Sequence, residues 1–160
     1  MLKTLAAFIL FTISAFSQNE MIMGSQQYSV TFPDGWDAAY DPDHPSGIFA
    51  RSQDQQIDML VYELPATLED VKMTTGNDLS FNYARIDNYE EVEDVLNGMP
   101  VTVIMADAYP QDSDAGVGVL IVLFHISDEM IIKVACELKP EVTEGSYREM
   151  EEIISSIKKL

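Results

Sequence analysis

Two histidines and a group of aspartates carry most of the chemistry that this sequence offers. The segment Asp41-Pro42-Asp43-His44 sets two carboxylates and an imidazole within four residues. Zn²⁺ favours nitrogen together with oxygen, and Ca²⁺ favours oxygen, so Asp41, Asp43 and His44 form a candidate divalent-cation site. Asp34 and Asp37 lie upstream in the same expected loop. The segment lacks the ligand spacing of an EF-hand, so the alternative is a polar turn rich in Asp and Pro.

His125 and Cys136 are the other two residues with catalytic potential. His125 lies near the end of an almost continuous apolar run, which favours a hydrogen-bonded structural histidine over a general base. The members of a Ser-His-Asp triad need not be adjacent in sequence, so a hydrolase is a further alternative. The sequence has no Gly-x-Ser-x-Gly, His-Glu-x-x-His, Cys-x-x-Cys or Walker motif. Cys136 is the sole cysteine, and its alternation with Ile132 and Val134 predicts a place in the core.

The charge of the chain excludes one class of partner. Its 160 residues include 27 acidic and 9 basic side chains, which gives a formal net charge of −18 at pH 7. Such a surface repels phosphate backbones, so we expect no nucleic-acid partner. Acidity also serves solubility, and by itself it does not define a binding site.

Residues 1–17 match the pattern of a secretory signal peptide. Lys3 gives a positive start, Leu5 to Phe16 are apolar or small, and small side chains precede a cleavage point near Ser17/Gln18. The apolar run is shorter than the roughly 20 residues that span a bilayer. We therefore expect export to the periplasm or the extracellular space, with no integral membrane segment in the mature chain.

The remaining chain is predicted to form one domain. Residues 18–27 are expected to be a flexible lead-in, and residues 28–160 a single compact unit, because no linker or repeat interrupts them. Nothing in the sequence requires a second copy, and we expect a monomer.

The hydrophobic patterns predict strands, two helices and a tight hairpin. Thr67-Leu68-Glu69-Asp70 resembles a capping box and opens a helix that ends near Asn82, and an apolar stripe after Pro140 predicts a closing helix. Asn97-Gly98 favours a type I′ hairpin. The expected strands cover 28–32, 48–51, 57–64, 89–96, 100–109, 117–126 and 130–138, with residues 34–47 as a loop.

These elements predict an α+β fold, with a largely antiparallel sheet of about six to seven strands and helices packed on it as an α/β/α sandwich. The run at 117–126 is apolar on both faces, so it is expected in the centre of the sheet. The run at 89–96 carries charge on both faces, which is typical of an edge strand.

Three local patterns together resemble the PsbP-like superfamily. They are the strand that ends in Phe32-Pro33-Asp34-Gly35-Trp36, the hairpin entered by Asn97-Gly98-Met99-Pro100, and the last helix ending in Ile153-Ile154-Ser155-Ser156-Ile157. The resemblance spans about residues 28–160. It implies the α/β/α sandwich of PsbP, DcrB-like envelope proteins and the Mog-type nuclear import factor.

The resemblance also implies a function class. Members of this superfamily look like non-enzymatic accessory or binding modules. The resemblance therefore implies an exported protein that acts through contacts with a protein or envelope component. We expect no cofactor. The alternatives from the residues remain open. They are a carrier of a cation or small ligand that uses the Asp41–His44 loop, and a hydrolase that uses His44 or His125.

Overall fold

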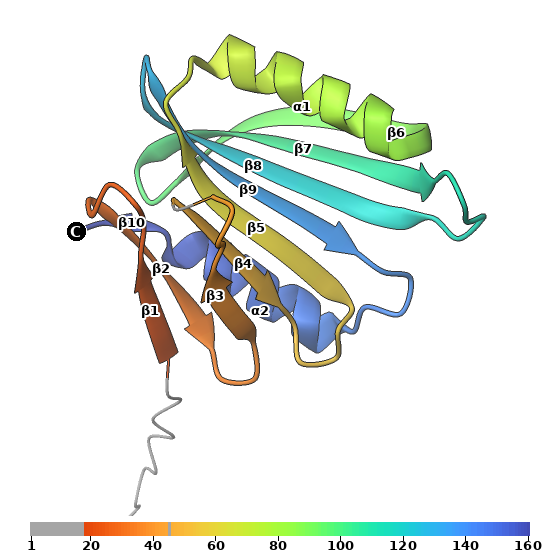
Figure 1. The fold of residues 1–160 in the computed structure, drawn as a ribbon, viewed down its shortest axis with the longest axis horizontal. Helices are drawn as coiled ribbons and strands as arrows, with labels where there is room; N and C mark the ends of the chain where they lie inside the picture. Colours follow the sequence, from red (N-terminus) through yellow and green to blue (C-terminus); the bar gives the residue numbers. More distant parts are fainter. Residues whose placement is uncertain (1–17, 45) are drawn as a thin grey trace, which may run out of the picture.

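The computed structural model describes residues 18–44 and 46–160. The predicted signal peptide, residues 1–17, lies outside the described residues and stays a prediction. Figure 1 shows a large twisted sheet with helix α1 and helix α2 on opposite faces, and a smaller sheet near the C-terminus.

Strands come in two groups around the first helix. Before it lie β1 (Gln18–Ile22), β2 (Tyr28–Pro33), β3 (Asp37–Tyr40), β4 (Gly47–Arg51) and β5 (Ile57–Leu64). The rest of the chain forms α1 (Leu68–Asn82), β6 (Tyr83–Leu96), β7 (Met99–Pro110), β8 (Val117–Ser127), β9 (Met130–Leu138), α2 (Glu144–Ser156) and β10 (Lys158–Lys159). A seven-stranded sheet has the order β3-β4-β5-β9-β8-β7-β6, and a three-stranded sheet has the order β1-β2-β10. All these neighbours pair antiparallel, which confirms the predicted α+β fold.

Strand β8 divides the two hydrophobic cores. Val122 and Phe124 point into the core that contains the buried side of α2, whereas Ile121 and Leu123 point into the core beneath α1. Alternate side chains of a strand face opposite sides of its sheet, so β8 is covered on both faces. The predicted cover on both faces is therefore confirmed, and β8 is an interior strand next to β9, the middle strand of the sheet.

Residues 18–22 differ from the predicted flexible lead-in, because they form strand β1. This strand pairs with β2 from Gln18↔Pro33 to Ile22↔Ser29. The turn after it is held by Glu63, whose carboxylate accepts bonds from Ser25 N at 2.7 Å and Ser25 Oγ at 2.6 Å. The strand begins with polar residues, so it lacks the alternation of apolar and polar residues from which strands are predicted.

The expected loop at 34–47 also contains a strand. Asp37–Tyr40 forms β3 and pairs with β4 at the edge of the large sheet. The Ala38-Ala39 pair gives no alternation signal, and the segment is positioned by its neighbours. Trp36 beside it is buried in the core, and its Nε1 donates to Glu149 Oε2 at 2.9 Å.

The predicted caps and turns are confirmed. Thr67 is the N-cap of α1 and its side chain accepts from Asp70 N. Asn97 and Gly98 have φ values of 52° and 76°, as a type I′ hairpin requires. Strand β6 lies at the sheet edge, with its acidic side chains exposed. Within residues 18–44 and 46–160, neither helix has the length and apolar character needed to cross a membrane.

A candidate binding cleft between helix α1 and the sheet

The Asp41–His44 loop brings two of the predicted metal ligands together. Asp41 Oδ2 lies 3.1 Å from His44 Nδ1, and Asp41 Oδ1 accepts from the backbone nitrogen of Asp43 at 2.9 Å. The bond from Asp43 is the main reason that the pKa of Asp41 lies below its usual value. Asp37 instead sits on strand β3, opposite Arg51 of β4.

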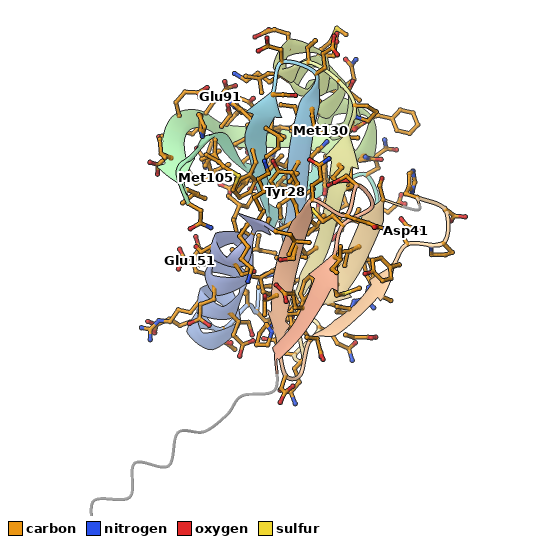
Figure 2. The ribbon with its side chains drawn as sticks, turned by 90° about the vertical axis from the view of Figure 1, so that its left-hand side faces the viewer. Tyr28, Asp41, Glu91, Met105, Met130 and Glu151 are labelled. Atoms are coloured by element: carbon orange, nitrogen blue, oxygen red, sulfur yellow. The ribbon has the colours of Figure 1, made fainter. Side chains whose placement is uncertain are left out.

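The described residues do not gather a larger set of ligands. No group of three or more His, Cys, Asp or Glu side chains is arranged to hold a metal ion in the described part of the chain. Figure 2 shows Asp41 on a projecting loop, on the opposite side of the molecule from Glu91 of β6. The loop therefore brings Asp41 and His44 together, but the Asp41 carboxylate already accepts a hydrogen bond from the backbone of the turn. The cation site stays a prediction.

His125 belongs to a chain of three side chains on neighbouring strands. The Thr102 hydroxyl donates to Glu93 Oε1 at 3.0 Å and lies 2.9 Å from His125 Nε2. Because a carboxylate only accepts, the hydroxyl proton points to Glu93, and His125 Nε2 must carry the proton that it shares with Thr102. A triad needs the reverse, an imidazole that takes the hydroxyl proton. Thr102 is also fully buried, so this arrangement matches the predicted structural histidine.

Cys136 lies in the core, as its strand pattern predicts. It is buried with Val134 and Ile132 in the core on the α2 side. Burial raises the pKa of its thiol to about 12. The nucleophile is the thiolate, so this cysteine is unreactive in the native fold.

A site that the sequence analysis did not identify lies beside helix α1. The buried stripe of the helix packs on residues of β7, β8 and β9, such as Ile104, Leu123 and Ile131. Phe49 of β4 and Leu60 and Tyr62 of β5 stay only partly buried. The helix therefore covers one part of its sheet face and leaves a cleft along its flank, over β5 and β9.

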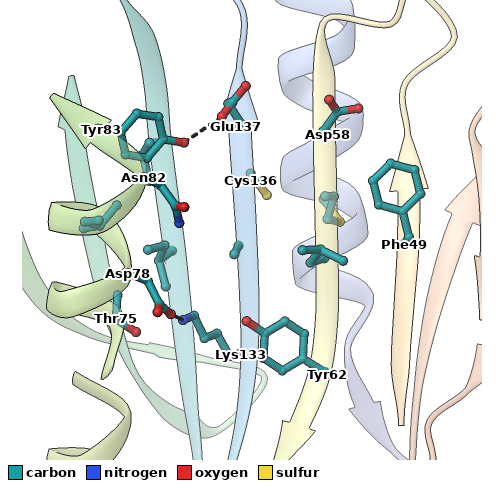
Figure 3. A pocket seen from close by; sticks show the side chains of 16 residues that line it. Phe49, Asp58, Tyr62, Thr75, Asp78, Asn82, Tyr83, Lys133, Cys136 and Glu137 are labelled. Carbon is teal, nitrogen blue, oxygen red and sulfur yellow. Dashed lines mark hydrogen bonds and ion pairs between the residues drawn. The ribbon is translucent and has the colours of Figure 1, made fainter. Parts of the chain in front are cut away.

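The cleft has a volume of about 380 Å³ and a mainly apolar wall. Small-molecule sites typically measure about 300 to 1,000 Å³, so this cleft has the size of a ligand site. Its apolar lining includes Leu79 of α1, Leu60 of β5, Val119 and Ile121 of β8, and Ala135 of β9. Figure 3 shows polar side chains at its two ends.

One end of the cleft holds a buried lysine. The side chain of Lys133 is 6% exposed, and its Nζ lies 3.9 Å from Asp78 Oδ2. The ammonium also lies 5.9 Å from the centre of the Tyr62 ring. Burial lowers the pKa of Lys133, and the charge of Asp78 opposes that shift only partly. Burial is also the main cause that raises the pKa of Tyr62.

The same end holds a buried hydroxyl. Thr75 of α1 is 1% exposed, and its Oγ1 has no hydrogen-bond partner among the described residues. Lys133 and Thr75 each interrupt an otherwise apolar pattern in the sequence. Lys133 interrupts the strand Met130-Ile131-Ile132-Lys133-Val134, and Thr75 lies between Val71 and Leu79 on the buried stripe of α1. These interruptions are the sequence signal that could have identified the cleft.

The acidic groups at the other end already have donors. Tyr83 Oη donates to Glu137 Oε2 at 2.6 Å, and Arg51 Nε donates to Asp58 Oδ1 at 2.5 Å. Burial, followed by this bond to Glu137, raises the pKa of Tyr83 far above its usual value. At the first end, by contrast, the Lys133 ammonium and the Thr75 hydroxyl have no hydrogen-bond partner in the part of the chain that the structure describes, and the Asp78 carboxylate beside them lies beyond hydrogen-bond distance of Lys133.

Comparisons with known proteins identify the fold. No family model and no curated protein matches the sequence. Among solved structures, cyanobacterial PsbP (CyanoP) from Synechocystis sp. PCC 6803 superposes with a TM-score of 0.60 at 14% identity, over 93% of this chain and 96% of that one. The Ran-binding protein Mog1p of Saccharomyces cerevisiae superposes with a TM-score of 0.58 at 11% identity, over 90% of this chain and 96% of that one.

These similarities confirm the fold that the sequence patterns predict. The protein has the PsbP-like α+β fold over nearly its whole length. At such low identity the likeness concerns the fold alone, because one fold hosts many functions.

Proposed function

We propose that this protein is an exported, non-enzymatic binding module, and that the cleft beside α1 is its binding site. The observation that carries the proposal is the partly uncovered sheet face, where a mainly apolar cleft ends in the buried Lys133 and Thr75. Binding sites combine an apolar wall with a few convergent polar groups, and this cleft has both. The partner is a protein or another component of the cell envelope. The yeast neighbour Mog1p is a Ran-binding protein, which is in keeping with a protein partner.

Two local observations favour binding over catalysis. His125 Nε2 is engaged as a donor to the buried Thr102 hydroxyl, and the Cys136 thiol is buried with a raised pKa. Neither residue is prepared to act as a base or a nucleophile.

Affinity capture with matched variants tests the binding site. The tagged protein is mixed with an envelope extract of its own organism, and the retained proteins and small molecules are quantified by mass spectrometry. Leu60→Glu places a charge in the apolar wall of the cleft, and Val95→Glu makes the same kind of change at a side chain that is 60% exposed on β6. We expect components that the native protein and Val95→Glu retain and that Leu60→Glu loses. If folded Leu60→Glu retains everything that the native protein does, the cleft is not the binding site.

Export rests on the signal pattern of residues 1–17 and has its own test. Expression in a bacterium followed by fractionation should place the protein outside the cytoplasm. Intact-mass spectrometry should then give the mass of a chain that starts at Gln18. Retention in the cytoplasm with residues 1–17 still attached contradicts export.

A further inference from the structure

We propose that the cleft beside α1 binds a small organic monocarboxylate, with the carboxylate at Lys133 and Thr75 and an apolar body along the wall formed by Leu60 and Leu79. The inference rests on the proposed function, because it takes the cleft as the binding site, and it chooses a small organic anion rather than a protein as the component that fills it. Three features of the cleft lead to it.

The first feature is the ammonium group of a largely buried lysine side chain, which has no hydrogen bond among the described residues. Lys133 has three N–H donors, and its 3.9 Å distance to Asp78 Oδ2 is too long for a hydrogen bond. A buried charge is costly unless it is paired and hydrogen-bonded. The side chain of Asp78 is 56% exposed, so it does not seal the ammonium from the cleft. An anion that enters the cleft therefore finds a cation that lacks a close partner.

The second feature is the unpartnered hydroxyl of Thr75. It is buried on the helix side of the same end of the cleft, and Figure 3 shows Thr75 of helix α1 and Lys133 of strand β9 pointing toward each other, with the Asp78 carboxylate beside them. A carboxylate has two oxygens that accept hydrogen bonds. One oxygen can accept from Lys133 and the other from Thr75, which satisfies both groups at once.

The third feature is the contrast between the two ends of the cleft. Glu137 lies four residues from Lys133 on β9, or about 13 Å along the strand. Its carboxylate and that of Asp58 already accept from Tyr83 and Arg51, so they offer little to a cationic ligand. They repel a second negative charge, which favours a monocarboxylate over a dicarboxylate. The apolar wall between the ends takes the carbon chain.

Titration calorimetry with octanoate tests the ligand class on the purified protein. We expect saturable binding of one octanoate per chain. Octanol and octylamine have the same carbon chain without the anion, and suberate adds a second carboxylate. Each of the three should bind at least about 10-fold more weakly, because hydrogen bonds to charged groups account for roughly that factor or more.

Variants locate the carboxylate. Lys133→Met and Thr75→Val should each weaken octanoate binding, the first by about 10-fold or more. Asp78→Asn should strengthen binding, since it removes the acid that competes for Lys133. Lys139→Met is the matched control, because Lys139 pairs with Asp58 and should leave the affinity unchanged. The first two variants are expected to fold, because each removes a buried polar group without a good partner. Circular dichroism and thermal unfolding check this.

The outcomes separate this inference from the proposed function. No saturable octanoate binding, equal binding of octylamine, or an unchanged affinity in folded Lys133→Met overturns the monocarboxylate. If octanoate fails while Leu60→Glu still loses partners that the native protein retains, the cleft remains the binding site and only its ligand class is wrong. If both fail, the cleft is not the site.

Discussion

The hydroxyl of Tyr83 donates a 2.6 Å hydrogen bond to Glu137 Oε2, and this bond joins the end of helix α1 to strand β9. Tyr83→Phe removes the donor and leaves the partly buried carboxylate of Glu137 without it. We expect the free energy of unfolding to fall by about 1 kcal/mol, the lower part of the range for bonds to charged groups, because the site is partly open to water. Urea unfolding at pH 7 measures this change.

Tyr147→Phe is the control for that measurement. Tyr147 lies on α2 and is 39% exposed, so loss of its hydroxyl should change stability little. Equal stability of Tyr83→Phe and the native protein contradicts the role of the bond.

The same tyrosine predicts a dependence on alkaline pH. Burial and the bond to Glu137 raise the pKa of Tyr83 above the value of 10.0 for a free side chain, so the folded protein holds the phenolic proton more tightly than the unfolded chain does. The stabilisation is therefore fully present below pH 10 and is lost as the pH rises above 10. The difference in unfolding free energy between the native protein and Tyr83→Phe should shrink from pH 9 to pH 11. A constant difference over this range contradicts the raised pKa.

Local signals predicted most of the fold and little of the site. Alternating strands, the Thr67 cap and the Asn97-Gly98 turn each depend on neighbouring residues, so the sequence shows them directly. Strands β1 and β3 were missed because partners fix them rather than their own pattern. The cleft was missed for a similar reason. Lys133 and Thr75 are 58 positions apart in the chain, and they line one cleft only because α1 packs against β9 in the folded protein.

His125 gives a test that separates a structural histidine from a catalytic one. Since the Thr102 hydroxyl donates to Glu93, neutral His125 should carry its proton on Nε2. Long-range ¹H–¹⁵N correlation spectra distinguish the two ring nitrogens and should show Nε2 protonated. Thr102→Val removes the acceptor and should alter the signals of this ring, whereas those of exposed His44 should not change. A ring protonated on Nδ1 instead contradicts this assignment and restores the triad hypothesis.

Two glycines form a matched pair for stability. A Cβ added at Gly76 or at Gly98 meets nothing within 4 Å, so space does not distinguish them. Gly76 lies inside α1, where alanine is more favourable by about 1 kcal/mol, and Gly76→Ala should stabilise the protein by that amount. Gly98 has a φ of 76°, which strains any residue with a Cβ, so Gly98→Ala should destabilise by about 1 kcal/mol. Thermal unfolding should move the two midpoints in opposite directions, and a shift in the same direction contradicts this account.

The predicted cation site at Asp41, Asp43 and His44 is tested by removing and restoring metal. Asp41 Oδ2 now lies 3.1 Å from His44 Nδ1, and a cation between them takes the place of that contact. A cation present at 100 times its dissociation constant stabilises by about 2.7 kcal/mol, which raises the unfolding midpoint by roughly 5 to 10 °C. Unfolding is followed in EDTA and then with Ca²⁺, Zn²⁺ or Mn²⁺. If the loop is a site, one cation gives this shift and His44→Ala abolishes it. The same shift in His44→Ala, or no shift with any cation, shows that the segment is a polar turn. In such a turn the Asp41 carboxylate only accepts the hydrogen bond from the backbone nitrogen of Asp43.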